Sequence, residues 1–114
     1  MLDGSVQLAC IHAVLPGGTR GLTHVWCLAV TGRDAFITSP AARWDTDASR
    51  PLTYGAFLHG IELFDNTIFG ISPPETSTMD PQQRLLLELG YGALHQAGLP
   101  RGSLLESGTA VFVG

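Results

Sequence analysis

Cysteine and histidine side chains are the groups in this chain that could supply a nucleophile, a general base or a soft metal ligand. The cysteines are Cys10 and Cys27, and the histidines are His12, His24, His59 and His95. The cysteines form no CxxC pair, so they support neither a zinc site nor a disulfide framework. No two histidines have metal-ligand spacing. Because unpaired cysteine is common in protein interiors as a small apolar residue, both cysteines are expected to be structural. The sequence predicts no metal or cofactor site.

A glycine-rich turn is the other feature with possible chemistry. The run from Pro16 to Gly21 reads Pro-Gly-Gly-Thr-Arg-Gly, and it follows an apolar segment and precedes a helical pattern, as a phosphate-binding turn would. Its glycines fit neither GxGxxG nor GxxxxGK[ST]. A plain turn is therefore favoured, and a small nucleotide-binding α/β module stays open as a weaker alternative.

Composition narrows the class of protein. The 114 residues are 45% hydrophobic and 14% charged, which describes one small globular unit with no internal repeat. Six arginines and no lysine give a formal charge of −4 without a basic cluster, so nucleic acid is not expected as a partner. No apolar run is long enough to span a membrane. The reduced cysteines and the absence of a signal sequence favour an intracellular location, in the cytoplasm or, as a second choice, a plastid.

The first half of the chain predicts a strand, a helix and a long loop region. Alternating apolar residues from Val6 to Leu15 indicate a strand that ends at the Pro16 turn. Apolar residues at helical spacing from Leu22 to Val30 indicate a short helix. Gly32 would take its left-handed cap position, and Thr19 or Thr23 its N-cap. From residue 33 to residue 66 we expect loops held by buried aromatic rings. These rings are Phe36, Trp44, Tyr54, Phe57 and Phe64.

The second half contains two proline-started helices. Ser72-Pro73-Pro74-Glu75 and Asp80-Pro81-Gln82-Gln83 each place a capping side chain before a first-turn proline. The longer helix is expected to run from Pro81 to about Gln96, with a break near Thr78 or Met79 before it and Gly98 as its stop. The residues from Thr109 to Gly114 form an apolar run typical of a buried strand.

The long helix is expected to be buried on most sides. Leucine and alanine side chains cover about 200° of its surface at 100° per residue. Its small residues, Gly90 and Gly92 among them, would let a neighbouring element approach closely. Arg84, Glu88 and His95 share the narrow polar face, where Arg84 and Glu88 would form a weak surface pair.

Nearly the whole chain carries an ordered series of motifs. They are Gly32-Arg33-Asp34-Ala35, Pro40 with Arg43-Trp44-Asp45, Phe64-Asp65, Phe69-Gly70-Ile71-Ser72-Pro73, Met79-Asp80-Pro81-Gln82-Gln83-Arg84, Ala93-Leu94, Ala97-Gly98 and Gly108-Thr109-Ala110-Val111-Phe112-Val113-Gly114. This order resembles the ketosynthase domain, a β-ketoacyl synthase, of polyketide synthases.

The chain departs from that family at several positions. Cys10 stands where the family usually has glycine, Ala13 where it often has cysteine, and Val14 and Pro74 where arginine is common. The stretch from Asp45 to Gly55 is shorter than is typical. We therefore expect the loop around Trp44 to differ from that of the family.

The resemblance implies an α/β fold, the N-terminal part of a thiolase-like αβαβα arrangement that is incomplete within residues 1–114. It also implies a decarboxylative Claisen condensation in polyketide or fatty-acid biosynthesis, in which a cysteine thiolate takes the acyl chain and two histidines stabilise the developing charge. No position here matches the family's cysteine or histidine motifs, so no catalytic residue is assigned. The resemblance implies two partners: acyl carrier protein, whose phosphopantetheine carries the substrates, and a second synthase subunit.

Three functions follow as hypotheses. The favoured one is part of a ketosynthase whose catalytic residues lie in further sequence, so that residues 1–114 are scaffold and inactive alone. The alternative is a non-catalytic, truncated ketosynthase-like protein that binds a partner through its long helix. The nucleotide-binding module is the third. With so few strands of its own, the chain alone is expected to aggregate or stay molten.

Overall fold

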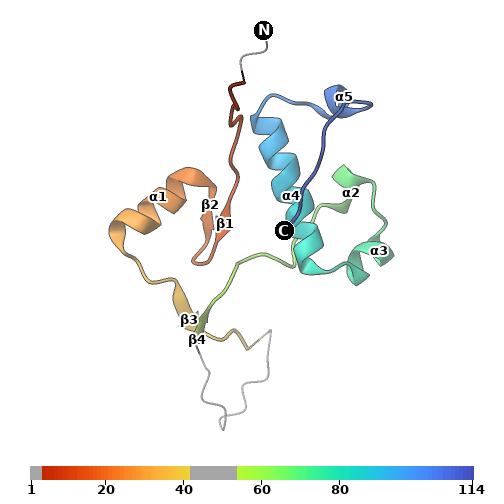
Figure 1. Cartoon of the computed structure of the whole chain (residues 1–114). Helices are drawn as coiled ribbons and strands as arrows, with labels where there is room; N and C mark the ends of the chain where they lie inside the picture. Colours follow the sequence, from red (N-terminus) through yellow and green to blue (C-terminus); the bar gives the residue numbers. More distant parts are fainter. Residues whose placement is uncertain (1–3, 42–53) are drawn as a thin grey trace.

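The computed structural model describes residues 4–41 and 54–114, and its elements are two small antiparallel strand pairs and five helices (Figure 1). In chain order they are β1 (Val14–Leu15), β2 (Thr19–Arg20), α1 (Gly21–Thr31), β3 (Phe36–Thr38), β4 (Tyr54–Ala56), α2 (Asn66–Phe69), α3 (Pro73–Thr78), α4 (Pro81–Gln96) and α5 (Arg101–Leu104).

The glycine turn closes a hairpin. β1 pairs antiparallel with β2, with Leu15 opposite Thr19, and Gly17 and Gly18 between them have φ angles of 78° and 74°. These left-handed angles favour glycine because it has no Cβ. Only Val14 and Leu15 of the predicted strand from Val6 to Leu15 form a ladder, so that prediction was largely wrong. A strand needs a neighbouring strand to share its hydrogen bonds. Within the described chain, residues 4–13 join no ladder, and the one backbone bond beyond the hairpin is from the Gly21 amide to the Ala13 carbonyl.

The first helix confirms the pattern from Leu22 to Val30. α1 begins at Gly21 and ends at Gly32, whose φ of 58° is the predicted left-handed cap. The N-cap prediction was wrong, because Arg20 occupies that position and no side chain caps the helix. Thr19 is instead taken up by β2, where it is buried.

The aromatic loop region contains a strand pair that the sequence pattern did not reveal. β3 and β4 are antiparallel, with Phe36 opposite Ala56 and Thr38 opposite Tyr54. Phe36 and Tyr54 are 63% and 70% exposed, so the prediction of buried rings was wrong for these two. Phe57 and Phe64 are half-buried. Trp44 and most of the shortened stretch from Asp45 to Gly55 lie outside the described residues.

The cap-and-proline signals of the second half are confirmed. Ser72 Oγ accepts a hydrogen bond from the Glu75 amide at the start of α3, and Asp80 Oδ1 accepts one of 2.7 Å from the Gln82 amide at the start of α4. Met79 has extended backbone angles, φ −68° and ψ 138°, and therefore interrupts the helical conformation between α3 and α4. The stop at Gly98 is a Schellman arrangement, in which the amides of Gly98 and Leu99 bond to the carbonyls of His95 and Leu94.

The described parts of the chain do not enclose a hydrophobic core. No hydrophobic residue within the described parts is fully buried, and the long helix α4 exposes Leu86, Leu87, Tyr91 and Leu94, so its expected burial on most sides is not found in this chain. The accessible surface is 9274 Å², against about 6,000 Å² for a compact monomer of this mass. The radius of gyration is 18.1 Å, where about 13 Å is usual for this length. The elements therefore stand without the neighbours that would cover them.

The C-terminal run is not a strand. Residues 105–114 form no ladder and no helix, and Phe112 is 93% exposed. The physical reason is the same as for residues 4–13: no described strand lies beside them. No helix in the described part of the chain is long and apolar enough to cross a bilayer.

Candidate functional site

Both cysteines have ordinary surroundings. Cys10 is half-buried, and its thiol donates a hydrogen bond of 3.2 Å to the Gln96 side-chain oxygen on α4. Cys27 is exposed on α1. A reactive thiol needs a cationic or basic neighbour that stabilises the thiolate, and an amide oxygen does not provide this. The geometry gives Cys10 a packing role between the N-terminal segment and α4.

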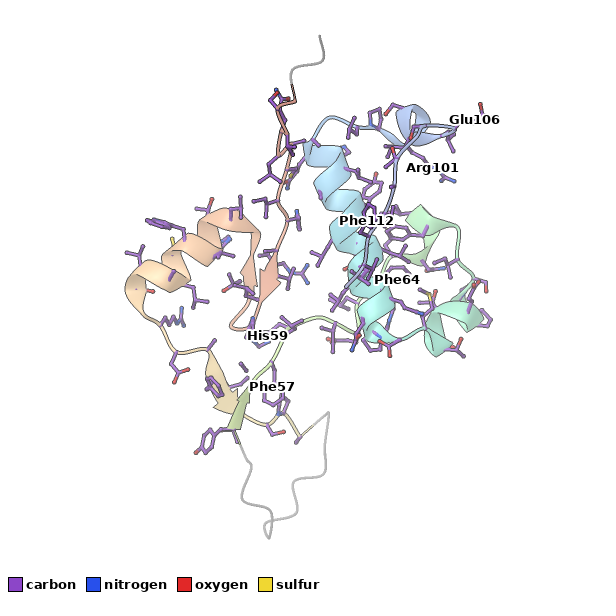
Figure 2. All side chains as sticks on the ribbon, in the orientation of Figure 1. Phe57, His59, Phe64, Arg101, Glu106 and Phe112 are labelled. Carbon is purple, nitrogen blue, oxygen red and sulfur yellow. The ribbon has the colours of Figure 1, made fainter. Side chains whose placement is uncertain are left out.

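The histidines occupy four separate settings. His12 packs closely against Gly92 on α4. A Cβ added to Gly92 would lie 3.2 Å from the Cε1 atom of His12. His24 Nδ1 lies 2.6 Å from the Arg20 carbonyl oxygen, and His95 stacks on Tyr91 with ring centroids 6.1 Å apart. His59 is exposed in the loop after β4 (Figure 2). Among the described residues, no three His, Cys, Asp or Glu side chains are grouped to hold a metal ion.

The contact between His12 and Gly92 agrees with the role that the sequence assigns to small residues on α4. Gly92 leaves room for the imidazole, and the His12 Nδ1 atom is buried there without a hydrogen-bond partner among the described residues. The N-terminal segment thus lies along α4 at two points, Cys10 against Gln96 and His12 against Gly92.

The hairpin geometry argues against the nucleotide-binding alternative. A phosphate-binding turn leads directly from a strand into a helix N-terminus, where free amides meet the anion. Here Gly17 and Gly18 connect two antiparallel strands, and the helix begins only after the second strand. One cavity of about 650 Å³ lies beside this turn, and His24, Cys27, Asp34 and His59 are among the residues that line it.

An apolar surface lies on the other side of the molecule, between α2, α4 and α5. It is a groove of about 480 Å³, which we call the α4 groove. Its lining residues are Ile68, Phe69, Leu86, Leu87, Gly90, Tyr91, Leu94, His95, Leu99, Pro100, Arg101 and Leu104. Leu86 is 51% exposed within it. The sequence revealed the apolar face of α4, but not the short helices α2 and α5 that border it.

An aromatic series fixes α2 against α4. Phe64 and Phe69 stack with centroids 5.2 Å apart, and Phe69 meets Tyr91 edge to face at 6.0 Å. Such pairs contribute about 0.5–1.5 kcal/mol each beyond their buried area. Phe64 and Phe69 belong to the family-like motifs found in the sequence, and the structure gives both rings a packing role.

Polar side chains in the second half of the chain cap helices or are partly buried. Asp65 caps α2: the Thr67 hydroxyl and then the Thr67 amide donate to its carboxylate, and these bonds lower the pKa of Asp65 below its usual value. Arg84 and Glu88 are half-buried, and among the described residues no ion pair joins them, so the predicted pair is not found. The Arg84 Nε atom is buried without a hydrogen-bond partner among the described residues. The described side chains build no assembly of nucleophile, base and oxyanion donors.

Comparison with known proteins decides the family. Residues 5–114 match the family described as β-ketoacyl synthase, N-terminal domain. The chain belongs to this family. Polyketide synthase GfsB of Streptomyces halstedii is 42% identical over 99% of this chain, and a phenolphthiocerol/phthiocerol polyketide synthase subunit from Mycobacterium tuberculosis is 43% identical over 96%. The chain spans 2% and 8% of these two relatives.

Solved structures agree with the sequence relatives. A ketosynthase from module 6 of the bacillaene synthase of Bacillus subtilis matches 83% of the chain at 34% identity with a TM-score of 0.76, and the chain spans 17% of it. An oxazolomycin ketosynthase domain of Streptomyces albus matches 87% of the chain at 27% identity with a TM-score of 0.73. The fold is therefore the N-terminal part of the thiolase-like α/β arrangement, as the resemblance implied.

Proposed function

We propose that residues 1–114 are a partial N-terminal ketosynthase domain that acts as scaffold in a β-ketoacyl-acyl carrier protein synthase. The observation that carries this proposal is the match of residues 5–114 to the N-terminal domain family, together with a span of only 17% of a solved ketosynthase. The reaction is a decarboxylative Claisen condensation in polyketide or fatty-acid biosynthesis. Polyketide synthesis is favoured because the relatives described above are polyketide synthases.

The chemistry requires groups that residues 1–114 are proposed not to supply. A cysteine thiolate first takes the acyl group from a thioester. Loss of CO₂ from a malonyl thioester then gives the carbanion that attacks this acyl group and releases the thiolate. Preorganised donors must stabilise the negative charge of these steps in a water-poor cavity. Cys10, bonded to an amide, and exposed Cys27 lack such surroundings in the described residues.

The proposed partners follow from this reaction. Acyl carrier protein would deliver substrates on phosphopantetheine, and a second synthase subunit would complete a dimer. The Mycobacterium tuberculosis relative is itself named as a subunit of a synthase.

A hybrid ketosynthase tests the scaffold role. In it, residues 1–114 replace the matching segment of the bacillaene module 6 ketosynthase, and acyl loading and condensation are measured. We expect an active hybrid whose kcat/KM changes by less than about twofold when Cys10→Ala and Cys27→Ala are combined. A hybrid that loses acyl loading with these two substitutions would place the nucleophile within residues 1–114. Transfer of radiolabelled acyl groups onto the chain alone would also overturn the proposal.

The open α4 groove favours a second candidate, a non-catalytic ketosynthase-like protein that binds a partner there. Leu86→Glu would then abolish capture of that partner, whereas Ser77→Glu, on the exposed surface of α3, would not. An inactive hybrid combined with specific binding of the intact chain to a ketosynthase would favour this candidate.

A further inference from the structure

We draw no further inference here: the strongest candidate, the cavity of about 650 Å³ beside the β1–β2 turn, whose lining combines Arg33 and Asp34 with His24 and His59, carries none because nothing in the structure shows what covers or fills it, and its described residues hold no set of metal ligands.

Discussion

The helical unit from Asp65 to Gly98 and the two terminal segments, residues 4–13 and 105–114, are specified in different ways. In the helical unit, each helix starts at a capping side chain, and α2 and α4 are followed by glycines with positive φ, Gly70 and Gly98. The terminal segments have apolar strand composition but form no ladder. Short-range hydrogen bonds are therefore sufficient for the first region, whereas the second requires neighbours from distant sequence.

The largest expected effect comes from supplying those neighbours. In the hybrid ketosynthase, amides from Ala110 to Val113 should gain protection against hydrogen exchange, from an opening free energy of about zero in the chain alone to about 5 kcal/mol or more. Amides in the middle of α4 should gain less, since their hydrogen bonds already exist. Exchange measured by mass spectrometry on the chain and on the hybrid checks this difference. An equal gain in exchange protection for α4 and for Ala110–Val113 would contradict the difference between the helical unit and the terminal segments.

The same distinction explains what the sequence could predict. The caps at Ser72 and Asp80, the break at Met79 and the stop at Gly98 were all predictable, because residues within one turn of each other determine them. The motif series also identified the family. By contrast, the strand pair β3 and β4 joins residues that are far apart in the sequence, such as Thr38 and Tyr54. No alternation within such short strands could reveal it.

The candidate site shows a similar limit. The apolar face of α4 was visible as a periodic pattern, and Gly92 was correctly predicted as a point of close approach. That His12 is the group that approaches, and that α2 and α5 border the α4 groove, depends on tertiary contacts. Where the catalytic residues of the complete domain lie stays a prediction.

The helix stop should be sensitive to a single methyl group. Gly98 has a φ of 73° and open space around its Cβ position, so Gly98→Ala adds conformational strain without a clash. The left-handed conformation costs a non-glycine residue about 1–2 kcal/mol. The opening free energy of the last turn of α4, measured by hydrogen exchange, should fall by this amount. Gly102→Ala in α5, where φ is not positive and space is also open, is the control and should leave α4 unchanged.

Alanine substitutions at Gly90 and Gly92 distinguish the effect of intrinsic helix propensity on α4 from the effect of tertiary packing. Alanine is favoured over glycine in a helix by about 0.8–1.0 kcal/mol, and a Cβ on Gly90 meets nothing within 4 Å. Gly90→Ala should therefore stabilise α4 by nearly that amount. Gly92→Ala should gain less than half as much, because its Cβ would lie 3.2 Å from His12 Cε1 and displace the N-terminal segment. Equal gains from the two substitutions would show that the segment does not pack on α4.

The smallest effect concerns the exposed cap of α2 and its dependence on pH. Hydrogen bonds from the Thr67 hydroxyl and amide lower the folded-state pKa of Asp65 below 3.8. A carboxyl group whose pKa is depressed on folding contributes stability above its unfolded pKa and loses it as pH falls through the folded value. The stabilisation of α2 should thus be complete above about pH 5 and should decline below pH 3.8.

Titration of the Asp65 carboxyl carbon by NMR checks the direction of this pKa shift. Thr67→Val, which removes only the hydroxyl donor, should move the midpoint back toward 3.8. A midpoint unchanged in Thr67→Val would assign the shift to the amide alone, and a midpoint above 3.8 in the parent chain would contradict the cap itself.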